Sequence, residues 1–192
     1  MKKEDSRVSK TKKKIKEAFL ELIEIKGYSH VSVCQIVKKA NINRNTFYLH
    51  YQDKEDLAKK LLYEASFKLN QTLGLDKNQF NINNLTKTHI QWRIRKLLHL
   101  ISPEIEFYRI IILDKSLRGL INELYEMIKK HFSFTLNIKN PCSNLIFEYT
   151  FTGMIGLIQQ WILYSPTNEY ETARILAQLT YENMCQFYNL NQ

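Results

Sequence analysis

Turn-forming residues are scarce in this chain of 192 residues, which contains only 5 glycines and 3 prolines. A sandwich or barrel of short strands requires many more turn residues, and a doubly wound α/β fold usually has glycine-rich loops. Hydrophobic residues make up 44% and charged residues 24% of the chain, a composition that can bury a core. The sequence therefore predicts an all-α protein of long helices joined by few loops.

Motifs for metal binding and catalysis are also missing. The 3 cysteines are far apart and form no CxxC pair, and the 5 histidines show no metal-ligand spacing. The sequence has no P-loop, GxGxxG, GxSxG or HExxH motif. We therefore expect no metal, no cofactor and no enzymatic activity. The amino-terminal segment lacks the apolar stretch of a signal peptide, which favours a cytoplasmic protein.

Positive charge is concentrated near the amino terminus. The chain carries 28 Lys and Arg against 19 Asp and Glu, and residues 1–60 hold 15 of the basic residues but only 8 of the acidic ones. A helix is predicted over residues 9–26, and its first two turns favour acidic side chains because of the helix dipole. Those turns instead contain Lys10, Lys12, Lys13, Lys14 and Lys16. This placement indicates an external polyanion, although charge alone also fits a solvated basic tail.

Two short helices follow, joined by a tight turn. Ser32 and Gln35 have the spacing of a capping box, which predicts a second helix that ends near Asn41. Asn43 is a suitable N-cap for a third helix, from residue 44 to about residue 50. Two helices of about two turns in this arrangement form a helix-turn-helix. Asp53 then caps a fourth helix over residues 54–73, followed by a polar loop over 74–84.

The third helix has one apolar and one polar side. At 100° per residue, Phe47 and Tyr51 share one side and should face the core. The opposite side carries types that read base edges, since Arg can pair with guanine, Asn with adenine, and an apolar tip can contact a thymine methyl group. This outward set is Arg44, Asn45, Tyr48 and Leu49. An ordinary helix pair with a solvated polar face is the alternative.

The run from residue 41 to residue 57 resembles the TetR/AcrR family of transcriptional regulators, whose signature is roughly G-V-x-x-x-T-L-Y-x-H-F-x-x-K-x-x-L. The identical positions are Thr46, Tyr48, His50, Lys54 and Leu57. Asn41 replaces the usual glycine, and Asn is the next-best residue for a left-handed turn. The resemblance covers about residues 8–69, and it implies a DNA-binding domain there and an effector-binding and dimerisation domain over residues 70–192.

The resemblance also implies roles for individual residues. It gives Arg44 and Asn45 as residues that read bases, with Gln35 as a weaker candidate, and the outward side of the third helix adds Tyr48 and Leu49. It gives Ser32, Thr46, His50 and Lys54 as phosphate contacts by hydroxyl, helix terminus or charge, and the basic start of the first helix adds Lys10 and Lys12. Tyr48 is placed by the resemblance at the phosphate or the sugar edge as well.

The carboxy-terminal part offers evidence of its own. Further helices are predicted over 85–101, 103–113, 116–136, 143–164 and 168–188. The helix over 143–164 contains a single charge, Glu148, and a helix that is apolar all round is expected to be buried all round. Its polar residues argue against a membrane span. With the last helix it resembles the family's four-helix dimer interface, where we expect Gly153, Gly156, Trp161 and Leu179.

The helices over 85–136 would enclose any ligand. The candidate pocket residues are the aromatic Trp92 and Tyr108 and the charged Glu148, although aromatic residues at helical spacing more often belong to a core.

Together these observations predict a homodimeric regulator that binds an inverted-repeat operator in double-stranded DNA. We expect it to be a repressor that a small effector releases from the operator. An activator whose carboxy-terminal domain binds a protein is the alternative. A basic helical protein that binds RNA or membranes without specificity is a third reading.

Overall fold

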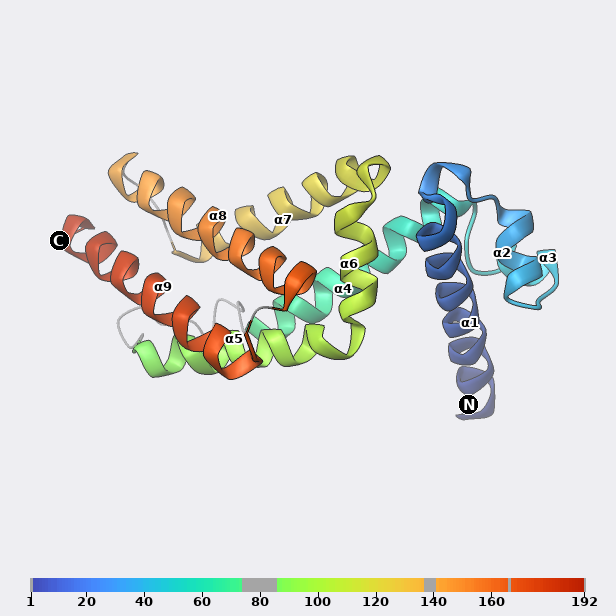
Figure 1. Ribbon diagram of the computed structural model, residues 1–192, viewed down its shortest axis with the longest axis horizontal. Helices are drawn as coiled ribbons and strands as arrows, with labels where there is room; N and C mark the ends of the chain where they lie inside the picture. Colours follow the sequence, from blue (N-terminus) through green and yellow to red (C-terminus); the bar gives the residue numbers. More distant parts are fainter. Residues whose placement is uncertain (1, 74–85, 137–140, 166, 192) are drawn as a thin grey trace. The chain divides into compact units, whose positions relative to one another are not determined.

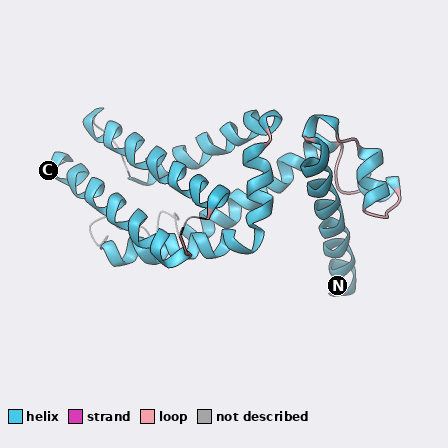
Figure 2. Cartoon of the chain, viewed as in Figure 1, coloured by secondary structure: helices cyan, strands magenta, loops and turns pink. Residues whose placement is uncertain are grey.

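The computed structural model describes residues 2–73, 86–136, 141–165 and 167–191 (Figure 1). Every regular element in these residues is helical, which confirms the predicted all-α class (Figure 2). The α-helices are α1 (Lys2–Lys26), α2 (Val33–Lys39), α3 (Arg44–Tyr48), α4 (Lys54–Leu73), α5 (Lys87–Ile101), α6 (Ile105–Leu113), α7 (Arg118–Leu136), α8 (Pro141–Tyr164) and α9 (Glu169–Asn191). Short 3-10 turns connect some of them: η1 (Tyr28–His30), η3 (Ser102–Glu104) and η4 (Lys115–Leu117). None of the helices described is long and apolar enough to cross a membrane.

The chain forms two compact units. The first comprises Met1–Ala65 with Ile110–Asn122, and the second comprises Ser66–Arg109 with Glu123–Gln192. The sequence predicted a division at residues 69 and 70, but it assigned the segment 110–122 to the second domain. The structure groups this segment with the first unit, where η4 packs against η1.

Helices α1 to α4 build the core of the first unit. α1 begins earlier than predicted, because its lysine-rich start consists largely of good helix formers. It ends at Lys26, and the next residue, Gly27, has a φ of 78° in the left-handed region that glycine tolerates. Within residues 7–65 the side chains that are at most 3% exposed are Ile15, Phe19, Ile23, Val31, Ile36, Phe47, Tyr51 and Leu57, and the segment 110–122 adds Leu117 at 1%. This core fixes α3 from one side only.

In the second unit, α9 packs against both α5 and α8. Ala173 and Ala177 of α9 are fully buried, and such small side chains allow neighbouring helices to approach closely. α8 buries Phe147, Phe151, Ile158, Trp161 and Ile162. It was expected to pack both on its own core and on a second subunit, and in the single chain one face of it is exposed. The predicted loop over 74–84 lies outside the described residues.

Candidate DNA-binding surface

The turn between α2 and α3 is fixed by local hydrogen bonds. Asn41 adopts φ 52°, the left-handed conformation that its side chain tolerates better than most. Its backbone N–H donates to the carbonyl of Lys38 at 3.3 Å, and that of Ile42 donates to the carbonyl of Val37 at 3.1 Å. These two bonds form a Schellman motif, which satisfies the last carbonyls of α2. The predicted tight turn is therefore confirmed.

Both helices of the pair have the caps that the sequence predicts. The backbone N–H of Gln35 donates to Ser32 Oγ at 3.4 Å, and the N–H of Ser32 donates to Gln35 Oε1 at 3.0 Å. This is the reciprocal capping box. The side chain of Asn43 accepts the N–H of Asn45 at 2.9 Å and so caps α3. Gln35 is thus partly engaged, although its amide NH₂ group can still donate to a base.

The two sides of α3 differ as predicted. Phe47 is fully buried, and its ring lies 5.6 Å from those of both Tyr48 and Tyr51. On the other side Tyr48 is 46% and Leu49 81% exposed, and Arg44 and Asn45 are exposed as well. An exposed leucine beside donors for base edges gives this face both polar and apolar contacts for a major groove.

The predicted phosphate contacts occupy different environments. Ser32, Lys10 and Lys12 are exposed, whereas Thr46 and His50 are half-buried. Burial lowers the pKa of His50, and the nearby ammonium groups of Lys12 and Lys60 lower it further. The lowered pKa favours the neutral imidazole, which can still donate one N–H to a phosphate oxygen.

Lys54 has a role inside the protein that the sequence did not reveal. Its ammonium group donates to the backbone carbonyls of Tyr28 at 3.1 Å and Ser29 at 3.2 Å, and it lies 4.7 Å from the centroid of the Tyr28 ring. The side chain is only 19% exposed. Lys54 therefore connects the start of α4 to η1 by hydrogen bonds. Its contact with a DNA phosphate stays a prediction, and only the third N–H of the ammonium group is left to make it.

Asp114, in the segment 110–122 of the first unit, accepts a hydrogen bond from η1. Its Oδ2 accepts the backbone N–H of Tyr28 at 2.6 Å, and its Oδ1 accepts the N–H of Ser116 at 2.9 Å. Burial by itself would raise the pKa of Asp114, but the hydrogen bonds from Ser116 and Tyr28 outweigh it and lower the pKa below its ordinary value. The contact thus depends on an ionised carboxylate.

Asp114→Asn should therefore change how stability depends on pH. Because the folded state lowers this pKa, the carboxylate stabilises the fold above the ordinary pKa of about 4, and the contribution is lost as the pH falls through the lowered value. We expect urea unfolding of the wild type to lose more stability between pH 7 and pH 3 than unfolding of the variant. Equal losses in the two proteins would contradict the role assigned to Asp114.

The second unit exposes a stripe without charge along α8. Its members are Leu145, Tyr149, Thr152, Gly153, Gly156, Leu157, Gln160 and Tyr164. Gly153 and Gly156, two of the predicted interface residues, have nothing within 4 Å of a Cβ built on them. Leu179 on α9 is 45% exposed. An exposed helix face without charge, with several large apolar side chains on it, is typical of a site that binds another protein surface.

Trp161, also expected at the dimer interface, is corrected by the structure. The side chain is only 5% exposed, and Nε1 donates to the carbonyl of Thr167 at 3.0 Å. Trp161 therefore belongs to the core of the second unit, where its indole N–H is satisfied within the chain.

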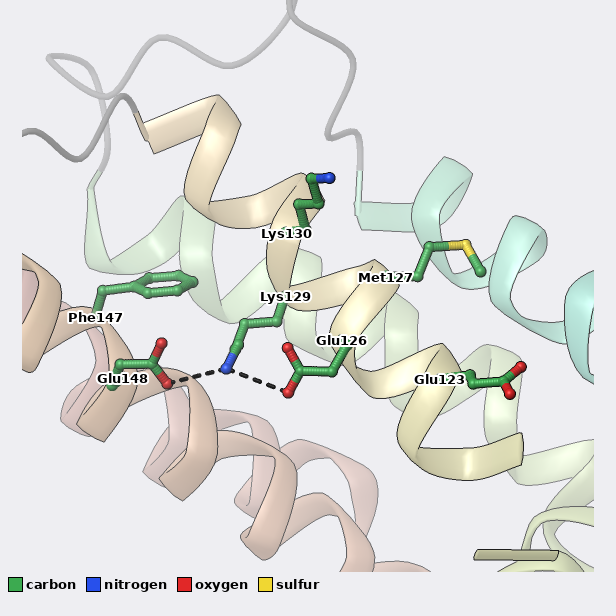
Figure 3. Close-up of a pocket in the computed structure, with 7 residues that line it drawn as sticks. All are labelled: Glu123, Glu126, Met127, Lys129, Lys130, Phe147 and Glu148. Carbon is green, nitrogen blue, oxygen red and sulfur yellow. Dashed lines mark hydrogen bonds and ion pairs between the residues drawn. The ribbon is translucent and has the colours of Figure 1, made fainter. Parts of the chain in front are cut away.

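A groove of about 480 Å³ lies between α7 and α8 (Figure 3). Its lining residues are Glu123, Glu126, Met127, Lys129, Lys130, Phe147 and Glu148. Lys129 Nζ lies 3.3 Å from a carboxylate oxygen of Glu126 and 3.3 Å from one of Glu148 (Figure 3). Desolvation would lower the pKa of Lys129, but the two carboxylates raise it above its ordinary value, so the ammonium group stays charged.

Of the predicted pocket residues, the structure places only Glu148 at this groove. Trp92 is 54% exposed on α5, with the ammonium group of Lys96 3.7 Å from its ring centroid. Tyr108 is half-buried, and burial raises the pKa of its phenol to about 12. Neither lines the groove. In the part of the chain that the structure describes, no group of His, Cys, Asp or Glu could hold a metal ion.

Two family models match the chain. The one described as "Bacterial regulatory proteins, tetR family" matches residues 15–61, and the one described as "Transcriptional regulator C-terminal region" matches residues 88–182. The first match contains the whole helix-turn-helix, and the second contains the α8 stripe. The first match lies within the first unit, whereas the second covers most of the second unit together with residues 110–122 of the first.

Three known proteins are similar to this chain in sequence or in structure. YxbF of Bacillus subtilis (strain 168), an uncharacterized HTH-type transcriptional regulator, is 30% identical over 86 residues, which are 43% of this chain and 23% of that protein. The HTH-type transcriptional regulator AcrR of Shigella flexneri is 25% identical over 170 residues, 79% of this chain and 78% of that protein. The solved structure of the dihydroxyacetone kinase operon activator DhaS has a TM-score of 0.56 at 20% identity, covering 93% of this chain and 96% of that one. The last likeness shows the fold alone.

Proposed function

The chain belongs to the TetR/AcrR family of transcriptional regulators, and on that premise we propose that it represses transcription by binding an inverted-repeat operator as a homodimer. The observation that carries the proposal is the exposed face of α3. This face exposes Arg44, Asn45 and Leu49, and on the opposite side of the helix Phe47 is buried in the core. A dimer on its operator represses by occupying DNA that the polymerase needs.

Residues on this face of α3 should determine which base pairs are preferred, whereas the lysines of α1 should add affinity for DNA of any sequence. Arg44→Ala should cost about 1–3 kcal/mol of binding to the cognate duplex and relax the preference at one base pair per half-site. Lys12→Ala should weaken cognate and scrambled duplexes by similar factors and lower the salt slope by about one unit. Lys12 suits this test better than Lys54, whose ammonium group is engaged within the protein.

The measurement is binding to a cognate duplex and a scrambled duplex across a salt series. The cognate duplex is the one that the full-length wild type selects from a random pool. If Arg44→Ala weakened both duplexes equally while Lys12→Ala altered specificity, the roles assigned to the two residues would be wrong.

The groove between α7 and α8 is the site we propose for a small effector. It combines an apolar wall, Phe147 and Met127, with charged groups of both signs. Lys129 bridges α7 and α8 through Glu148, so a ligand that competes for either group would change how the two helices are held. Release of the bound duplex by small charged molecules, and its loss in Glu148→Gln, would support this site. Release that is unchanged in that variant would exclude it.

A second candidate is activation through a protein partner. DhaS, whose structure is similar, is named as an operon activator. The outer face of α5 exposes Trp92, Arg95 and Lys96, and the helix contains no acidic residue. Aromatic and arginine side chains are enriched at protein interfaces. A second polypeptide that copurifies with the wild type, but not with Trp92→Ala, would favour this candidate over effector control.

A further inference from the structure

Arg44 and Tyr48 interact directly on the exposed face of α3. They are four residues apart, so their side chains lie on the same side of the helix. Arg44 Nη2 donates to the phenolic oxygen of Tyr48 at 3.2 Å, and the guanidinium carbon lies 5.6 Å from the centroid of the Tyr48 ring. The phenolic oxygen of Tyr48 therefore restricts the orientation of the Arg44 guanidinium group.

Tyr48 is itself held in place. Its ring meets the ring of Phe47 edge to face, with centroids 5.6 Å apart and an interplanar angle of 90°. Phe47 is fully buried, so this contact links the half-exposed tyrosine to the core. A long exposed side chain such as Arg44 would otherwise sample many rotamers, and fixing it on binding has a cost.

We propose that Tyr48 is a positioning residue, which orders the guanidinium group of Arg44 for contact with a base edge before DNA is bound. The inference rests on the proposed function, because it concerns the same α3 face. The phenolic oxygen occupies one of the five N–H donors of Arg44, so enough donors remain for the two acceptors of a guanine. This role is distinct from a phosphate contact by Tyr48, because it acts only through Arg44.

A double-mutant cycle tests the coupling between the two residues. The proteins are full-length wild type, Tyr48→Phe, Arg44→Ala and the double variant. The probes are the duplex that the wild type selects from a random pool and its single-base-pair variants. Tyr48→Phe keeps the ring and removes only the oxygen that accepts from Arg44. Tyr63→Phe is the matched control, since Tyr63 is a half-exposed tyrosine of α4.

Tyr48→Phe should weaken the selected duplex about 3- to 10-fold, the size expected for ordering one long side chain. The loss should fall on the same base pair whose discrimination Arg44→Ala relaxes, and the salt slope should not change. In the Arg44→Ala background, Tyr48→Phe should change affinity less than about 2-fold, because the group it positions is gone. Tyr63→Phe should behave like the wild type.

Other outcomes overturn the inference. An equal loss on every duplex, the same with and without Arg44 and accompanied by a smaller salt slope, would make Tyr48 a phosphate contact. Unchanged or tighter binding by Tyr48→Phe would show that the pair does not assist base reading. Sequence-specific binding by the wild type without coupling in the cycle overturns only this inference. A wild type that selects no duplex overturns the proposed function as well.

Discussion

Gly156→Arg should convert the dimer to a monomer and abolish operator binding at the same time. The residue lies in the middle of the uncharged stripe on α8, and nothing lies within 4 Å of a Cβ built there, so the chain's own fold accepts a side chain. A guanidinium group in an apolar interface would be desolvated without a partner, which is strongly unfavourable. Operator affinity should fall by about 10³-fold or more, towards the level of non-specific binding.

The measurements are the mass in solution and the binding of the selected duplex. Gly119→Arg is the matched control, because Gly119 of α7 is also an exposed helical glycine with no atom within 4 Å of a built Cβ. It should leave the dimer intact. A Gly156→Arg protein that stays dimeric, or a monomer that binds the duplex as tightly as the wild type, would contradict the coupling of dimerisation to DNA binding.

Phe47→Ala should destabilise the first unit by about 3–5 kcal/mol, the usual cost of removing a buried aromatic ring and leaving a cavity. Phe47 is fully buried and contacts the rings of Tyr48 and Tyr51, so its loss loosens the whole of α3. Sequence-specific binding should disappear while dimerisation through the second unit persists. Urea unfolding and duplex binding measure the two effects.

Leu49→Ala is the control on the same helix. Leu49 is 81% exposed, and substitutions at such positions usually change stability by no more than about 0.5 kcal/mol. A Phe47→Ala protein that unfolds within 1 kcal/mol of the wild type would show that α3 does not depend on this ring.

The local features of the helix-turn-helix could be read from the sequence. Caps and turns depend on residues within about four positions of one another, and the capping box of Ser32 and Gln35, the cap of Asn43 and the left-handed Asn41 all occur as predicted. The orientation of α3 followed from the 3.6-residue period, because Phe47 and Tyr51 are the large apolar side chains on one side of it. Arg44, Asn45, Tyr48 and Leu49 are exposed for the same reason.

Contacts between distant residues could not be read in this way. Asp114 accepts the N–H of Tyr28 from 86 residues away, and no local pattern marks either residue. Lys54 matched a position of the family signature. The signature does not show, however, that the Lys54 ammonium group donates hydrogen bonds to two backbone carbonyls of η1. Trp161 was expected at an interface because α8 is apolar throughout, yet composition alone does not tell which side of a helix its own chain covers.

Selection of duplexes from a random pool by the full-length chain shows whether two copies of α3 read an inverted repeat. Two copies of α3 related by a two-fold axis must enter major grooves at a separation of about 34–36 Å or a multiple of it. The selected sequences should therefore contain an inverted repeat with half-sites one or more helical turns apart, and Arg44→Ala should relax the preference at one base pair in each half. Recovery of a single asymmetric half-site, or of no preferred sequence, would contradict it.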